Sequence, residues 1–117
     1  MPYYMAQVGY KDEQVKALIS NPQNRAEEAR KVIEAFGGKL HHFSFAFGES
    51  DLIIIAEAPD NESMAAIAMA VTGAGTASHF RTTVLLTMDE AVNAMKKAGS
   101  VVSGYKAPSG QGNLAAF

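Results

Sequence analysis

The sequence predicts an α+β protein with a ferredoxin-like fold, a four-stranded antiparallel sheet with helices on one face that pairs with a second copy into a dimeric α/β barrel. Strand-type and helix-type hydrophobic patterns alternate in the order β-α-β-β-α-β. Only three residues, 48–50, separate the second strand from the third, which leaves no room for the helix that a doubly wound sheet requires. The third strand is apolar on both faces, so both faces are expected to be buried.

The first strand is expected at residues 3–10 (YYMAQVGY), a short stretch rich in aromatic and apolar residues and closed by a glycine. From residue 13 to residue 36 the apolar residues recur at intervals of three and four, which is the period of a helix. Pro22 cannot lie inside a straight helix, so two helical pieces are expected. The Gly37-Gly38 pair is expected to end the second helical piece, because glycine readily adopts the left-handed backbone conformation found at helix C-termini.

A hairpin is expected next, with strands at residues 39–47 and 51–58. The quartet Gly-Glu-Ser-Asp joins them. Gly48 is expected to supply a positive φ, and Asp51 to close the turn with its own side chain. This quartet is therefore interpreted as turn chemistry rather than as a reactive site.

The second long helix follows residues 59–62 (PDNE), where Asp60 or Asn61 can act as its N-cap. A glycine, Gly73 or Gly75, is expected to end it. Because this helix is apolar nearly all round, we expect other parts of the protein to cover it on every side.

The fourth strand is expected at residues 78–87, and Thr87 with Glu90 forms a capping box that opens a terminal helix. The remainder of the chain is rich in Gly and Ser and has no hydrophobic period. The chain is therefore divided into a ferredoxin-like α/β barrel domain at residues 1–98 and a C-terminal arm at residues 99–117.

Composition excludes several classes of function. The chain has 117 residues, no cysteine, and a net charge of -2 from 10 basic and 12 acidic residues. The absence of cysteine excludes disulfides, thiolate nucleophiles and Cys-ligated metals. The nearly balanced charge offers no excess of basic residues for binding nucleic acid. No apolar run approaches a membrane span and no secretory signal opens the chain, so a cytoplasmic protein without membrane or nucleic-acid partners is expected.

The strongest indication of a partner is the third strand. Leu52, Ile53, Ile54 and Ile55 place bulky apolar groups on both sides of the sheet. The chain has enough helix to cover one side only, so the other is expected to meet an identical sheet in a homodimer or higher oligomer.

The hairpin register predicts which side chains reach that second side. The turn is expected to pair Phe43 with Ala56 on the helix side, and to set His42 directly across from Glu57 on the barrel side, with Ser44 opposite Ile55. The first and third strands are expected to be parallel neighbours in the centre of the sheet.

This arrangement predicts that Gln7, His42, Glu57 and Arg81 converge at one end of the barrel side, at the opposite end from the bend. One interpretation is a buried ionic network at the dimer interface. The other is a small-ligand pocket in which His42 is a base or hydrogen-bond partner, Glu57 orients it and Arg81 holds an anionic group, with Ser44 nearby.

No metal and no cofactor are expected. Adjacent residues on a strand point to opposite faces, so His41 and His42 cannot hold one ion together. His79 lies near the start of a strand, where a partly exposed imidazole is common, so no functional role is assigned to it. The sequence has no Gly-rich phosphate loop and no nucleophile elbow.

Beyond these patterns, the stretch FAFGESDLIIIAEAPDNE, with GGK before it and RTT and TMDEAVNAMKKAG after it, resembles the GYD domain family over nearly the whole chain. That family is named for a Gly-x-Tyr-Asp turn, which Gly48 and Asp51 match, and Ser50 stands in the place of the Tyr. The resemblance implies a ferredoxin-like fold related to dimeric α/β barrels, and it implies no reaction. The other matching positions are Glu57, Pro59, Arg81 and Thr82.

The sequence therefore predicts a homodimeric small-molecule-binding or accessory protein. An alternative is a cofactor-free monooxygenase or isomerase of dimeric α/β barrel type, which acts on a small aromatic or acidic substrate with His42 as base. A third possibility is an assembly module whose arm, residues 99–117, wraps a neighbouring subunit. Whether the protein is an enzyme is left open.

Overall fold

The computed structural model describes residues 1–108 and divides the chain into two compact units, residues 1–85 and residues 86–117. We describe each unit by itself. Within residues 1–108, no helix combines the length and the apolar character needed to cross a membrane.

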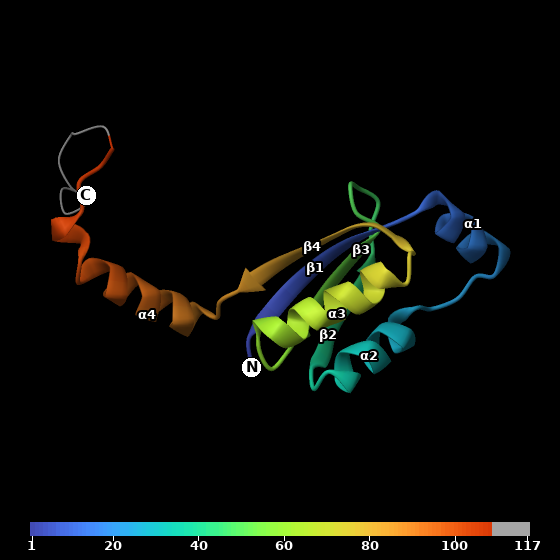
Figure 1. Cartoon of the computed structure of the whole chain (residues 1–117), viewed down its shortest axis with the longest axis horizontal. Helices are drawn as coiled ribbons and strands as arrows, with labels where there is room; N and C mark the ends of the chain where they lie inside the picture. The colour runs from blue at the N-terminus through green and yellow to red at the C-terminus, as the bar shows by residue number, and fades with distance from the viewer. Residues whose placement is uncertain (109–117) are drawn as a thin grey trace. The chain divides into compact units, whose positions relative to one another are not determined.

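The first unit contains four strands and three helices (Figure 1). In chain order they are β1 (Tyr3–Tyr10), α1 (Asp12–Ser20), α2 (Ala26–Ala35), β2 (Lys39–Phe45), β3 (Leu52–Glu57), α3 (Asn61–Gly73) and β4 (Ala77–Leu85). This order confirms the predicted β-α-β-β-α-β pattern, with the first helical region in two pieces.

The four strands form one antiparallel sheet in the order β2-β3-β1-β4. The α+β, ferredoxin-like prediction is therefore confirmed. The expectation that the first and third strands run parallel is wrong, because β1 pairs with β3 antiparallel, with Tyr3 opposite Glu57 and Gln7 opposite Ile53. Helices α1 and α2 return the chain so that β2 runs in the same direction as β1, and the β2–β3 hairpin then reverses it, so β3 runs against β1.

One face of the sheet carries the hydrophobic core beneath α2 and α3, and we call it the helix-covered face (Figure 1). Tyr4 is only 2 % exposed, and its hydroxyl donates a hydrogen bond to Asn61 Oδ1 at 2.6 Å. Ile33 of α2 and Ile67 of α3 are buried against the same cluster. The other buried members of this core are Leu40, Ala56, Ala58 and Met64.

Local sequence signals explain where the helices begin and end. Pro22 lies in the segment between α1 and α2, as expected from its missing N–H. Gly37 adopts φ +82° just after α2, a conformation that glycine adopts without strain. Asp60 caps α3, since its carboxylate accepts a hydrogen bond from the Ser63 N–H at 2.8 Å.

The expectation that α3 is covered on every side is wrong within residues 1–85. Met64 and Ile67 are buried, whereas Met69 on the same helix is 72 % exposed. A helix that lies on a sheet buries only the side that faces the sheet, however apolar its other sides are.

The second unit contains the predicted terminal helix, α4 (Met88–Gly99), followed by a short 3₁₀ helix, η1 (Val102–Gly104). The capping box is confirmed, because Thr87 Oγ1 accepts from the Glu90 N–H and the Glu90 carboxylate accepts from the Thr87 N–H. Residues 109–117, nearly half of the predicted arm, lie outside the described residues, so the division into residues 1–98 and 99–117 stays a prediction.

Candidate functional site

The candidate site lies on the second face of the sheet, which no helix of residues 1–85 covers. Because side chains alternate along each strand, the residues between the buried ones point to this side. We call it the uncovered face. Its members are Tyr3, Met5, Gln7 and Gly9 of β1, Lys39, His41, His42 and Ser44 of β2, Ile53, Ile55 and Glu57 of β3, and His79, Arg81, Thr83 and Leu85 of β4.

The predicted hairpin register is wrong by two residues. The structure pairs Phe43 with Ile54, so His42 lies opposite Ile55 and not opposite Glu57. In addition, the register shifts between Leu40 and His42, where β2 carries one extra residue, His41. Such a bulge re-aims side chains locally, and sequence periodicity alone does not reveal it.

The bulge brings His41, rather than His42, to Glu57. The His41 Nε2 and Glu57 Oε2 atoms lie 2.6 Å apart, with 29 % and 17 % of the two side chains exposed. The Tyr3 ring stacks on the His41 ring with their centroids 5.1 Å apart. A carboxylate and an aromatic ring therefore fix the orientation of one partly exposed imidazole.

His42 also faces this side of the sheet, where its Nε2 is hydrogen-bonded to Ser44 Oγ. The expectation that the two neighbouring histidines point to opposite faces is wrong, because the bulge interrupts the alternation. Within residues 1–108, no group of three or more His, Asp or Glu side chains is placed to hold a metal ion.

Gln7 and Arg81 lie at the other end of the uncovered face, where they pair across β1 and β4. Glu57 pairs with Tyr3, four residues from Gln7, which corresponds to about 13 Å along the strand. The predicted convergence of four polar side chains is therefore wrong: the antiparallel pairing of β1 and β3 separates Glu57 from Gln7 and Arg81.

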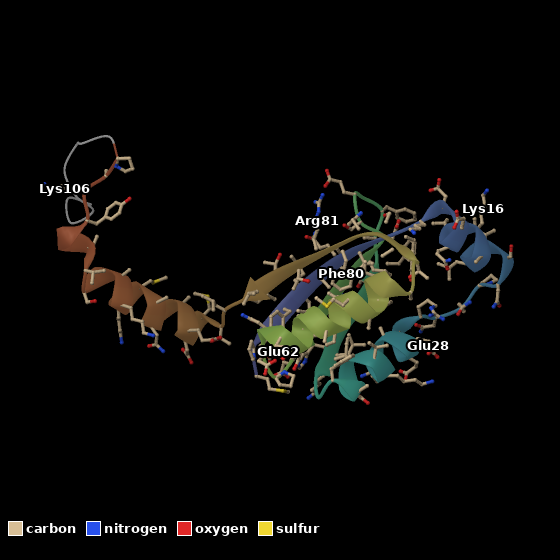
Figure 2. All side chains as sticks on the ribbon, in the orientation of Figure 1. Lys16, Glu28, Glu62, Phe80, Arg81 and Lys106 are labelled. Carbon is tan, nitrogen blue, oxygen red and sulfur yellow. The ribbon has the colours of Figure 1, made fainter. Side chains whose placement is uncertain are left out.

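Arg81 is directed away from the helices, whereas its neighbour Phe80 lies on the α3 side of the strand (Figure 2). The Arg81 guanidinium lies 3.9 Å from the Glu49 carboxylate, and both side chains are largely exposed. This ion pair is long and solvated, so it contributes little to stability. The bend therefore lies at the same end of the sheet as Arg81, not at the opposite end as predicted.

The bend also contains a buried polar residue, Ser50. Its hydroxyl lies 2.9 Å from His79 Nε2. Gly9 makes room for this pair, because a Cβ at residue 9 would lie 2.3 Å from the His79 ring. Neither His79 nor Ser50 is a candidate from the sequence, and no local motif marks their meeting, since Gly9, Ser50 and His79 come from three separate segments.

Asp51 ties the bend to β1. Its carboxylate accepts a hydrogen bond from the Tyr10 N–H at 2.7 Å, and its own N–H donates to the Val8 carbonyl at 2.9 Å. The expected positive φ at Gly48 is wrong, because the positive-φ glycines among residues 1–108 are Gly37 and Gly75. Asp51 thus fixes the bend through a neighbouring strand rather than through a local turn.

The comparison with protein families agrees with this architecture. A family model described as the GYD domain matches residues 4–95. The chain belongs to the GYD domain family. No curated protein was found to be similar to the chain.

The GYD match extends from β1 to α4 and includes every residue of the sheet except Tyr3. The resemblance expected from the sequence is confirmed.

Proposed function

We propose that this GYD-domain chain forms a homodimer through the uncovered face and binds a small organic molecule between the two sheets. The observation that carries the proposal is the mixed character of that face. It presents the apolar side chains of Met5, Ile53, Ile55 and Leu85 together with the oriented His41–Glu57 pair.

Apolar side chains on a broad sheet face favour burial, since removing apolar surface from water is worth about 25 cal/mol per Å². A second copy offers the same surface and closes the assembly by two-fold symmetry. The resulting space between two sheets is the dimeric α/β barrel. It would place His41 and Glu57 of each subunit at its lining, where they can fix the polar part of a ligand.

A second candidate function, catalysis, is favoured by the His41–Glu57 contact. A carboxylate that accepts a hydrogen bond from one imidazole nitrogen fixes the orientation and tautomer of the ring, which leaves the other nitrogen to act as a general base. In this candidate His41 takes the role assigned from the sequence to His42. The reaction class is that of a cofactor-free monooxygenase or isomerase acting on a small aromatic or acidic substrate.

The test of the dimer is native mass spectrometry together with sedimentation velocity of the purified protein and of Ile55→Asp. We expect a dimer for the wild type, with any retained small molecule visible as extra mass. We expect a monomer with an unchanged circular dichroism spectrum for Ile55→Asp. Burying a carboxylate against the partner's apolar face is costly without a counter-charge.

The matched control is Ile19→Asp, the same substitution at a 73 % exposed position of α1. It should leave the dimer intact. A wild-type monomer at micromolar concentration, or a dimer that survives Ile55→Asp, would refute the proposed assembly.

The ligand site is tested in the same spectra with His41→Ala and Glu57→Gln. If the wild type retains a small molecule, both variants should lose it and remain dimeric. Retention by both variants would assign the pair to the interface alone.

A further inference from the structure

A separate pocket of about 400 Å³ lies on the helix-covered face, between the sheet and helices α1, α2 and α3. Its volume falls within the range of about 300–1,000 Å³ that is usual for small-molecule sites. All of its lining residues belong to residues 1–85. It lies on the other side of the sheet from His41 and Glu57, so it does not depend on the proposed dimer.

The pocket has an apolar interior. Val8, Leu52, Ile54 and Phe80 form its floor, and α2 and α3 contribute further aliphatic side chains. Phe80 can be seen between the sheet and α3 in Figure 2. Within residues 1–108, no buried side-chain nitrogen or oxygen lacks a hydrogen-bond partner. The interior therefore suits the apolar body of a ligand and offers it no unpaired polar group.

The pocket extends from the core beneath α2 and α3, where Tyr4, Ile33 and Ile67 line it, to the end of the sheet next to α1. Helix α1 does not close this end of the sheet. The core cluster at this end consists of Ala6, Val8 and Leu52, and its buried members include no helix residue. Helix α1 lies beyond the end of the sheet and buries no residue, although Leu18 lines the pocket (Figure 1). The sheet is therefore only partly covered where β1 ends.

Polar side chains gather at this same end. Tyr10 ends β1, Gln14 belongs to α1, and Gln23 and Arg25 lie just before α2. The Arg25 guanidinium is close to the Tyr10 phenol: burial raises the pKa of Tyr10, and the positive charge of Arg25 opposes that rise. These four side chains form a polar rim at one end of an apolar pocket.

Arg25 is the cation of this rim. It donates a hydrogen bond to Gln23 Oε1 at 2.8 Å, and no carboxylate in residues 1–108 lies within 4.0 Å of it. The other charged lining residue, Glu28, pairs with Lys31 at 3.3 Å. The guanidinium is therefore available to an anionic group that enters the rim.

We propose that this pocket binds an amphipathic monocarboxylate, such as a fatty acid, with its chain on the sheet floor and its carboxylate on Arg25. A guanidinium matches a carboxylate with two parallel hydrogen bonds, which fixes the head group. The Gln14, Gln23 and Tyr10 side chains supply further hydrogen-bonding groups around it.

The test is isothermal titration calorimetry of the full chain with octanoate, dodecanoate and hexadecanoate below their micellar concentrations, and with dodecan-1-ol as the neutral analogue. Arg25→Gln should weaken dodecanoate binding by about tenfold or more, the usual cost of a lost hydrogen bond to a charged group, and leave dodecan-1-ol binding unchanged. The matched control, Arg30→Gln, changes an arginine of α2 that does not line the pocket and should leave both affinities unchanged.

A second variant fills the pocket. Ala70 lines it from an exposed position on α3, so Ala70→Phe adds volume at the rim without overpacking the core. It should abolish binding of both dodecanoate and dodecan-1-ol. Ile55→Asp should keep wild-type affinity for dodecanoate, which separates this pocket from the proposed barrel site.

Two results would overturn the proposal. One is the absence of dodecanoate binding by the wild type up to about 1 mM, which corresponds to a binding free energy weaker than about 4 kcal/mol. This result is expected if α1 itself folds over the pocket and fills it. The other is an equal loss of affinity for dodecanoate and dodecan-1-ol in Arg25→Gln, which would mean that Arg25 does not bind the carboxylate.

Discussion

The two faces of the sheet are built from the same four strands and differ in almost every chemical property. On the helix-covered face, Tyr4, Ile33 and Ile67 are buried in an apolar core that also lines the pocket. The uncovered face mixes aliphatic side chains with histidines and with Glu57. Because alternate residues of one strand supply both faces, a single sequence can specify a core and a recognition surface independently.

The largest expected effect is a difference in the stability lost when an isoleucine is truncated on one face or on the other. Ile67→Ala should lower the free energy of unfolding by about 3 kcal/mol, because it leaves a cavity beneath α3. Ile53→Ala on the uncovered face should cost a monomer less than about 1.5 kcal/mol, because the side chain is only partly buried there.

Urea denaturation at two protein concentrations measures both variants. The Ile53→Ala effect should grow with protein concentration if that face is a dimer interface. Equal losses of unfolding free energy for the two substitutions, independent of protein concentration, would show that the two faces do not differ in this way.

The second prediction concerns Tyr4. Tyr4→Phe should cost about 1 kcal/mol near neutral pH, because it removes the hydrogen bond to Asn61. Burial raises the pKa of Tyr4 above its ordinary value of 10.0, and the Asp60 carboxylate raises it further. The folded state then keeps a proton that the unfolded chain loses, so this part of the stability is complete below pH 10 and declines as the pH rises above it.

Thermal unfolding between pH 8 and pH 11 tests this prediction. Tyr4→Phe should show a shallower alkaline decline than the wild type. Tyr3→Phe, the neighbouring substitution on the uncovered face, should retain the wild-type decline. The same slope in all three proteins would show that Tyr4 does not carry the effect.

The third prediction asks whether the His41–Glu57 pair belongs to the fold or to a site. Both side chains are partly exposed, so Glu57→Gln should lower the free energy of unfolding by less than about 1 kcal/mol. Chemical denaturation of Glu57→Gln and His41→Ala measures it. A loss of about 3 kcal/mol or more would indicate a structural ion pair rather than a binding group.

The smallest expected effect is at the N-terminus of α3, a helix of the covered face. Hydrogen bonds from Ser63 lower the pKa of Asp60 below its ordinary value of 3.8. The unfolded chain therefore takes up a proton first, so the cap stabilises the fold above about pH 4 and loses this contribution as the pH falls through the folded value.

Thermal unfolding of Asp60→Ala and Asp60→Asn checks this cap. Asp60→Ala should lower the melting temperature slightly at pH 7, and by a smaller amount at low pH, where protonation removes the carboxylate charge. Asp60→Asn keeps an acceptor oxygen, so its melting temperature at pH 7 should lie between those of the wild type and Asp60→Ala. An equal effect of Asp60→Ala at both pH values would rule out a role for the carboxylate charge.

Most of the fold could be predicted from the sequence, because hydrophobic period and helix caps act over a few residues. Gly37, Asp60 and the Thr87–Glu90 box all mark real helix ends. The candidate site was predicted less well. The correct face was assigned to His42, Ser44 and Glu57, but the partner of Glu57 is His41.

The sequence by itself determined the order of the elements, the alternation that sorts residues onto two faces, and the helix ends, because these depend on neighbours within one or two turns of chain. Only the tertiary structure decided which residues meet. The register, the bulge at His41 and the pocket beside α1 depend on how strands and helices distant in sequence fit together. A shift of two residues keeps every side chain on its face and changes its partner, so a hydrophobic pattern of period two cannot detect it.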